Sequence, residues 1–136
     1  MVMRALISES DCETLNDIKA AFGICLDEWE LVTNGSVNDL LSMIKNKSFD
    51  VFILSDLVET SSLDIVRQIR CYSQSPLIIL SRINDAPVIV KAFEYGANAY
   101  MHKPFSQLEL MARVRALLKR KQLNNQLSIK TRRSGR

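Results

Sequence analysis

Cysteine and histidine are scarce in this sequence. Its 136 residues include three cysteines, Cys12, Cys25 and Cys71, and a single histidine, His102. The cysteines are odd in number and widely spaced, with neither a CxxC pair nor a histidine partner. This pattern argues against a disulfide framework and against a zinc site. We therefore expect reduced thiols.

Glycine loops, catalytic pairs and long apolar runs are also missing. The four glycines form no phosphate-cradling loop, and no nucleophile has a base placed to activate it, so nothing indicates an enzyme. The longest apolar stretches are interrupted within about ten residues, which is well short of a membrane span. Met1 to Arg4 does not open a signal peptide. We expect a cytoplasmic protein that is not an enzyme.

Charge is distributed unevenly along the chain. The sequence is 47% hydrophobic and 24% charged, as expected for one soluble domain, with a net charge of +3. Seven bases and no acid follow from Lys119 onward, which leaves 11 bases against 15 acids before it. A mildly acidic body is therefore joined to a basic tail. Such a tail indicates either a linker to a missing domain or a contact with nucleic acid.

Short apolar runs alternate five times with segments of helical periodicity. The expected strands cover residues 4–8, 29–33, 49–56, 77–81 and 98–102. The third run is apolar from Val51 to Leu54 and the fourth from Leu77 to Leu80, which is typical of strands buried on both faces. The alternation predicts an α/β fold with a parallel sheet covered by helices on both sides. Beyond about Leu123 the apolar content is too low to pack, so we expect a frayed helix end and a flexible arm.

Helix boundaries are marked by capping residues. Ser10 to Glu13 and Ser106 to Glu109 both have the form of a capping box, and each precedes an amphipathic segment. Asp85 is a candidate N-cap for the fourth helix, and Gly96 is a candidate glycine at its carboxyl end. These signals place the first helix from Ser10, the fourth between Asp85 and Gly96, and the fifth from Ser106.

Four polar residues stand at the expected carboxyl ends of different strands. They are Glu9, Ser55, Ser81 and Lys103. Because the carboxyl ends of parallel strands share one edge of the sheet, we expect an acid, two hydroxyls and an ammonium group to approach one another. A single polar strand end is commonly only a solvated terminus. Four together, with Lys103 directly before Pro104, indicate a site.

This pattern resembles the receiver domain of two-component response regulators. The resemblance covers residues 3 to about 121 and is carried by Glu9, Gly96 to Tyr100 and Lys103-Pro104-Phe105. The stretch from Gly96 to Arg115 is most similar to the OmpR/PhoB subfamily of transcription factors. The resemblance implies a flavodoxin-like three-layer sandwich with strand order 2-1-3-4-5, five helices and a cis Lys103–Pro104 bond. Residues 1–122 would form the receiver domain, and residues 123–136 a basic flexible tail or linker to a DNA-binding domain.

The resemblance also assigns roles to the strand ends. Family members hold magnesium with an acid pair that falls here on Glu9 and Ser10, and they accept phosphate on an aspartate that falls on Ser55. The hydroxyl position falls on Ser81 and the lysine on Lys103. Two of the three acids are therefore missing. A serine without a base is a poor nucleophile, and Glu9 alone is a weak magnesium ligand set, so we expect no cofactor.

Asp56 supports an alternative interpretation. A one-residue slip would make it the phosphoacceptor of a conventional receiver with magnesium, although strand side chains alternate in direction and Asp56 should then point away from Lys103. Without an acceptor carboxylate, we expect Lys103 to pair with Glu9. Asp56 or Asp11 would help to balance the lysine charge.

The remaining expectations concern partners. In the subfamily the fourth helix, fifth strand and fifth helix form a dimer face, and its charged and aromatic positions fall on Lys91, Tyr100, Glu109, Arg113 and Arg115. Asn98 and Ala99 replace acids usual there, so a homodimer would depend more on apolar contacts. Tyr100 is either the family's aromatic switch residue or an ordinary half-buried strand tyrosine. We expect a phosphorylation-independent receiver that controls transcription by dimerising. Its protein partner would be a histidine kinase or another protein. DNA would be bound through a domain outside this chain.

Overall fold

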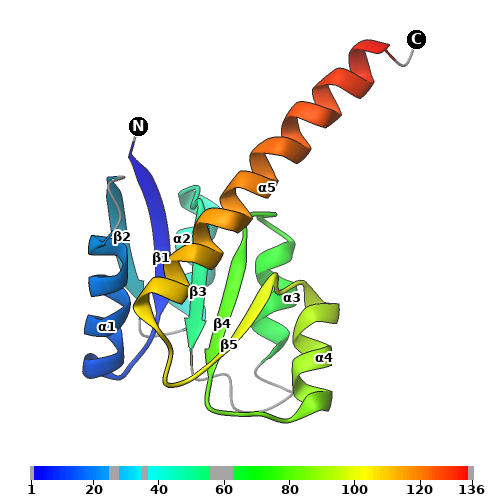
Figure 1. Cartoon of the computed structure of the whole chain (residues 1–136). Helices are drawn as coiled ribbons and strands as arrows, with labels where there is room; N and C mark the ends of the chain where they lie inside the picture. The colour runs from blue at the N-terminus through cyan, green and yellow to red at the C-terminus, as the bar shows by residue number, and fades with distance from the viewer. Residues whose placement is uncertain (1, 25–27, 35–36, 56–62, 135–136) are drawn as a thin grey trace.

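Five parallel strands form a single sheet in a computed structural model that describes residues 2–24, 28–34, 37–55 and 63–134. The strands are β1 (Met3–Ser8), β2 (Trp29–Asn34), β3 (Val51–Ser55), β4 (Leu77–Ser81) and β5 (Ala99–His102). Their order in the sheet is β2-β1-β3-β4-β5, which confirms the expected 2-1-3-4-5 topology (Figure 1). All carboxyl ends of the strands therefore lie at one edge.

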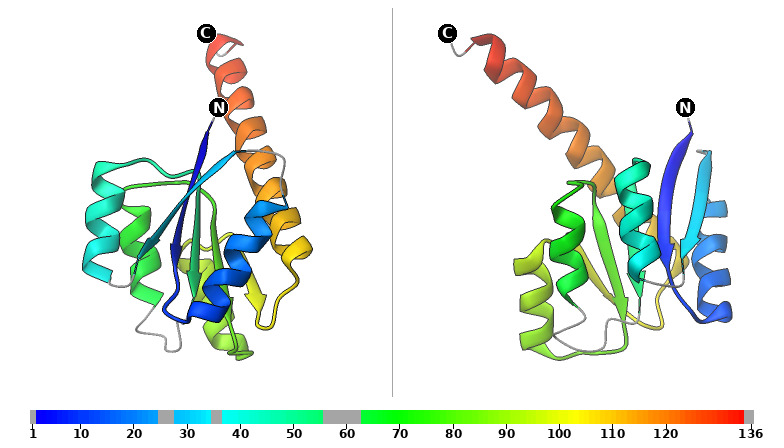
Figure 2. Two further views of the ribbon diagram at one scale, coloured as in Figure 1. Left: turned by 90° about the vertical axis from the view of Figure 1, so that its left-hand side faces the viewer. Right: turned by 180° about the vertical axis from the view of Figure 1, so that it is seen from behind.

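Five helices cover the two faces of the sheet. They are α1 (Cys12–Gly23), α2 (Val37–Asn46), α3 (Asp64–Arg70), α4 (Ala86–Tyr95) and α5 (Gln107–Ser134). α1 and α5 pack together on one face, and α2, α3 and α4 cover the other (Figure 2). The flavodoxin-like three-layer architecture is confirmed.

The central strands divide the core between the two faces. Along β3, Phe52 and Leu54 join the cluster under α2, α3 and α4, whereas Val51 and Ile53 join the cluster under α1 and α5. Each of these side chains is almost fully buried. A strand buried on both faces needs apolar residues at every position, which is why the sequence shows an unbroken run rather than an alternation.

N-cap residues explain where α1 and α5 begin, but the cap of α1 is not the residue that the sequence suggested. The expected capping role of Ser10 is wrong, because Asp11 is the N-cap of α1 and its carboxylate accepts hydrogen bonds from the Thr14 amide at 3.0 Å and the Thr14 hydroxyl at 2.6 Å. A carboxylate at the first turn also interacts favourably with the helix dipole. Ser106 caps α5 as expected, since its hydroxyl accepts from the Glu109 amide at 3.3 Å.

Gly96 ends α4 in a conformation that only glycine adopts easily. Its φ of 124° lies in the left-handed region. A Cβ atom at this position would stand 2.8 Å from Cγ of Arg70, so the backbone also needs the space. Gly96 is therefore fixed both by conformation and by the close approach of α3.

α5 runs back across the sheet and leaves the body at the edge formed by the amino ends of the strands (Figure 1). It remains helical through Ser134, so the segment from residue 123 is a helix where the sequence suggested a frayed arm. Its use as a linker stays a prediction. The Lys103–Pro104 peptide bond is cis, as the resemblance implied. Within the described residues, no helix combines the length and apolar character needed to span a membrane.

Candidate functional site

The four strand-end residues Glu9, Ser55, Ser81 and Lys103, called the strand-end site below, are all buried. Their exposed fractions are between 2% and 6%. The register pairs Ser8 of β1 with Leu54 of β3, so Glu9 and Ser55 are the next residues along two adjacent strands. Four polar groups at one sheet edge are thus withdrawn from solvent. Each of them needs a hydrogen-bond partner within the protein, because a buried polar group without one destabilises the fold.

Glu9 and Lys103 form the ion pair that the sequence predicted. The Lys103 Nζ donates to Glu9 Oε2 at 3.2 Å, and the two side chains are 5% and 0% exposed. The other carboxylate oxygen, Glu9 Oε1, accepts from the Asp11 amide at 3.3 Å. Because both charges are desolvated, the loss of either partner would leave an uncompensated charge in the interior.

Ser55 stands at the tip of the fully buried strand β3. Its Oγ is buried and has no hydrogen-bond partner among the described residues. A buried hydroxyl without a partner costs about 1 to 3 kcal/mol in lost hydration. Among the described residues, β3 therefore ends in a buried polar atom that has no hydrogen-bond partner.

Ser81 and Asp11 support the loops around the site. The Ser81 hydroxyl accepts from the Ile83 amide at 3.0 Å, and the Ser81 carbonyl accepts from the Lys103 amide at 2.8 Å. The hydrogen bonds from Thr14 lower the pKa of Asp11, with a smaller contribution from the positive charges of Arg82 and Lys103. These contacts fix the turns that carry Glu9 and Lys103.

Two other residues expected at the site, Ser10 and Asp56, are not among its buried groups as described. Ser10 is exposed and lies beside the site on the loop from β1 to α1. Asp56, the alternative acceptor, lies outside the residues that the structure describes. The strand-end site that can be described therefore contains one carboxylate, one ammonium group and two hydroxyls.

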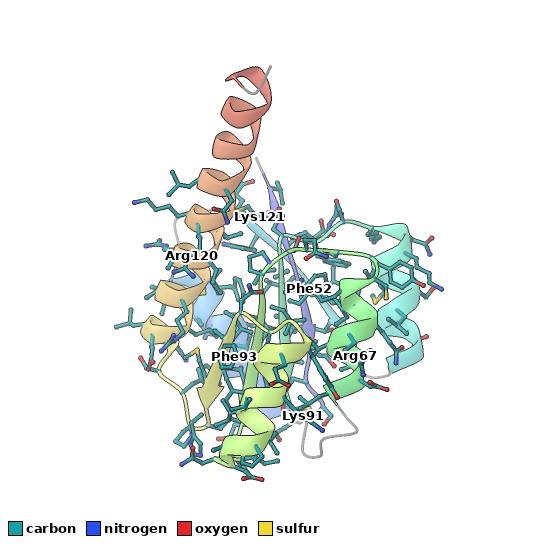
Figure 3. All side chains as sticks on the ribbon, turned by 90° about the vertical axis from the view of Figure 1, so that its right-hand side faces the viewer. Phe52, Arg67, Lys91, Phe93, Arg120 and Lys121 are labelled. Carbon is teal, nitrogen blue, oxygen red and sulfur yellow. The ribbon has the colours of Figure 1, made fainter. Side chains whose placement is uncertain are left out.

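Side chains of the expected dimer face lie on α4, β5 and α5. Tyr100 is half-buried, and its hydroxyl donates to the Ile83 carbonyl at 2.9 Å, which ties β5 to the loop after β4. Lys91 and Phe93 are both exposed on α4, where Figure 3 labels them on different sides of the helix. Glu109 and Arg113 form an ion pair with each other along α5, with 3.5 Å between Glu109 Oε1 and a guanidinium nitrogen of Arg113.

A second polar cluster, which no sequence pattern predicted, lies at the opposite edge of the sheet. The Arg70 guanidinium donates to the Gly96, Ser73 and Ser75 carbonyls and to Asn98 Oδ1, at distances from 2.6 to 3.2 Å. Partial burial lowers the pKa of Arg70. An arginine at the end of a helix usually faces solvent, so only the fold could identify this one as structural.

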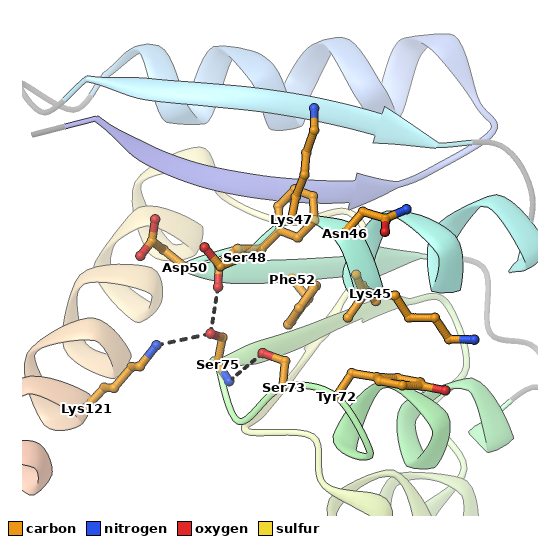
Figure 4. A pocket seen from close by; sticks show the side chains of 12 residues that line it. Lys45, Asn46, Lys47, Ser48, Asp50, Phe52, Tyr72, Ser73, Ser75 and Lys121 are labelled. Atoms are coloured by element: carbon orange, nitrogen blue, oxygen red, sulfur yellow. Dashed lines mark hydrogen bonds between the residues drawn. The ribbon is translucent and has the colours of Figure 1, made fainter.

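Ser75 connects this cluster to α5. Its hydroxyl donates to the Phe49 carbonyl at 2.6 Å and accepts from the Lys121 Nζ at 3.0 Å (Figure 4). The surrounding pocket of about 480 Å³ lies between the end of α2, the loop before β4 and α5. We call Arg70, Ser75, Asn98 and Lys121 the amino-edge network. It fixes the point at which α5 leaves the body.

Known proteins resemble this chain in sequence. ArlR, a response regulator of Staphylococcus saprophyticus, is 36% identical over 86 residues, covering 62% of this chain and 39% of ArlR. The cell cycle transcriptional regulator CtrA of Caulobacter vibrioides is 30% identical over 131 residues, covering 95% of this chain and 56% of CtrA. The chain spans about half the length of the curated relatives it matches.

Solved structures resemble it in fold. A response regulator from Thermotoga maritima superposes with a TM-score of 0.78 at 19% identity, over 88% of this chain and 99% of that one. HP1043, an orphan response regulator of H. pylori, gives 0.73 at 25% identity, over 85% and 96% of the two chains. The sequence profile of the response regulator receiver domain matches residues 7–115. With most of its length matched and the same sheet order, this chain belongs to the family of response regulator receiver domains.

Proposed function

We propose that this receiver domain works without phosphorylation and controls transcription by dimerising through α4, β5 and α5. The observation that carries the proposal is Ser55, a buried neutral hydroxyl at the strand tip where the family resemblance places an aspartate. Transfer of phosphate to a carboxylate gives a reactive acyl phosphate. A serine needs a neighbouring base to act as a nucleophile, and the one carboxylate described nearby, Glu9, is bonded to Lys103.

Magnesium also fits the described residues poorly. The cation prefers several oxygen ligands with carboxylates among them. Glu9 offers one carboxylate, and both of its oxygens already accept hydrogen bonds, one of them from an ammonium group. We therefore propose that the site holds no resident metal. A Glu9–Lys103 pair would instead keep the loops around the strand ends in one arrangement.

Apolar exposure supports the dimer face. Val90 and Phe93 on α4 and Leu108 at the start of α5 are 54%, 46% and 69% exposed. Asn98 is not available for a cross-subunit contact of the usual kind, because its Oδ1 accepts from Arg70 and from the Leu77 amide. A homodimer here would bury apolar side chains, with Lys91 at the edge of the contact.

The relatives support the regulatory class. CtrA is named a transcriptional regulator, and HP1043 an orphan response regulator. Because this chain covers about half of its curated relatives, DNA binding by a further domain remains part of the proposal. The partner that meets the domain is a histidine kinase or another protein.

Incubation with acetyl phosphate followed by intact mass measurement tests the proposal. We expect no added phosphoryl group on the wild-type chain in the presence of magnesium. Ser55→Asp serves as the matched variant, since it restores an acceptor at the same strand tip. A mass increase on the wild type that disappears in Asp56→Asn would establish the conventional receiver instead.

Sedimentation at low salt tests the dimer face. Phe93→Glu should abolish association because it places a charge in the apolar contact, and Lys91→Glu should weaken it. Lys19→Glu on α1 is the control with the same charge change on another exposed surface. Unchanged association of Phe93→Glu would rule out this face.

A further inference from the structure

The distal half of α5 is a projecting helix of one charge sign. Beyond Glu109 the sequence contains nine bases and no acid, and α5 is continuous through Ser134. Lys121 is the last residue of the helix with a described bond to the body, through Ser75. Past this point α5 stands clear of the sheet and of the other helices (Figures 1 and 2).

We propose that residues 119–134 bind duplex DNA through its phosphates, independently of any further domain. The helix extends about 20 Å past Lys121 at 1.5 Å per residue. Its diameter of about 10 to 12 Å matches the major groove of B-DNA, which is about 12 Å wide. The length and the width both suit a groove contact.

The arrangement of the bases suits a groove lined by phosphates on both sides. Lys119, Arg120 and Lys121 are consecutive, so they leave the helix axis in three different directions. Lys119 and Arg120 are exposed, whereas Lys121 is half-buried against Ser75. The body before Lys119 carries four more acids than bases, so it would be repelled by DNA. Contact would thus be confined to the projecting helix.

An anionic membrane is the other polyanion that a basic helix could meet, and the composition disfavours it. Helices that lie in a membrane surface have a continuous apolar face opposite their bases. The 16 residues from Lys119 to Ser134 include three apolar side chains, Leu123, Leu127 and Ile129, among asparagines, glutamines and bases. This segment has the charge for a phosphate surface but too little apolar area for insertion.

The test measures binding of the full chain to a fluorescent duplex of mixed sequence by anisotropy, without a phosphodonor. We expect micromolar affinity at low salt and a loss of about 100-fold between about 50 and 200 mM salt, as counterion release at several phosphates requires. Because no phosphodonor is present, the result does not depend on how Ser55 behaves.

Two variants with the same loss of charge separate the helix from the body. The tail variant changes five bases to glutamine and keeps Lys121: Lys119→Gln, Arg120→Gln, Lys130→Gln, Arg132→Gln and Arg133→Gln. The body variant changes five exposed bases outside the proposed dimer face: Lys19→Gln, Lys45→Gln, Lys47→Gln, Arg67→Gln and Arg82→Gln.

We expect the tail variant to lose at least about 30-fold in affinity and the body variant less than about threefold, because phosphate contacts contribute in proportion to their number. Circular dichroism confirms that each variant is folded. Equal losses in both variants, or binding that does not depend on salt, would overturn the proposal. Tail-dependent binding to phosphatidylglycerol vesicles without binding to the duplex would also overturn it and assign the helix to membranes.

Discussion

Two serines at opposite edges of the sheet are equally buried and differently bonded. Ser55, at the carboxyl end of β3, and Ser75, just before β4, are each 6% exposed. The Ser75 hydroxyl has both a donor and an acceptor partner, whereas the Ser55 hydroxyl has none among the described residues. The Ser75 hydroxyl thus belongs to a bonded network, whereas the Ser55 hydroxyl is, with Trp29 Nε1 at the start of β2, one of the buried side-chain atoms that have no partner among the described residues.

We propose that the network around Ser75 serves stability and that the strand-end site around Ser55 is shaped by function. Natural cores satisfy almost all buried polar groups, so exceptions tend to mark sites with another purpose. The amino-edge network joins α3, the loop before β4, the loop before β5 and α5 through Arg70 and Ser75. The strand-end site contains a buried ion pair between Glu9 and Lys103.

The largest expected effect concerns that ion pair. Lys103→Met should destabilise the fold by about 3 to 5 kcal/mol, because it leaves the Glu9 carboxylate buried without its cation. The double variant Glu9→Leu with Lys103→Met should recover most of this loss. Urea unfolding of the two single variants and the double variant gives the coupling energy. A coupling near zero would mean that the pair does not hold the strand ends together.

At the other edge, Arg70→Met should cost about 3 kcal/mol, because four acceptors, most of them partly buried, lose a charged donor at once. Arg67→Met on the same helix is the control. Its ion pair with Asp64 is exposed and its guanidinium stacks over Tyr95, so its loss should cost about 1 kcal/mol or less. Similar losses in both variants would show that Arg70 is no more structural than its neighbour.

The two serines give the most direct test of the comparison. Ser75→Ala should destabilise by about 1 to 2 kcal/mol, since it leaves the Phe49 carbonyl and the Lys121 ammonium group without this partner. Ser55→Ala should be neutral or stabilise by up to about 1 kcal/mol, because it removes a buried hydroxyl that has no hydrogen bond to any described residue. Thermal unfolding at one pH and protein concentration compares them. Destabilisation of equal size in both would refute the contrast.

The smallest expected effect is pH-dependent and concerns the cap of α1. The pKa of Asp11 is lowered from its ordinary value of 3.8 by the hydrogen bonds from Thr14. A carboxyl with a lowered folded-state pKa stabilises the fold above its unfolded value and loses that contribution as the pH falls through the lowered pKa. Asp11→Asn can accept the same bonds without titrating. The melting temperature of the wild type relative to Asp11→Asn should therefore fall as the pH drops below 3.8, and a constant difference would count against the cap.

Local signals in the sequence specified much of the fold. The apolar runs of β3 and β4 required burial on both faces, and Ser106 and Gly96 marked the ends of helices by their own backbone chemistry. The strand-end residues followed from the same pattern, because parallel strands bring their carboxyl ends to one edge whatever the loops contain. The choice between Ser10 and Asp11 as a cap was not visible, since either side chain suits an N-cap.

The sequence by itself determined the order of elements, the buried strands and the four strand-end residues, because these depend on periodicity and on short-range capping. Only the tertiary structure decided how the polar groups pair. Arg70, Ser75, Asn98 and Lys121 are up to 51 positions apart and look like solvated residues until the chain is folded. Their partners are mostly backbone carbonyls, which every residue possesses, so no pattern of side chains could reveal them.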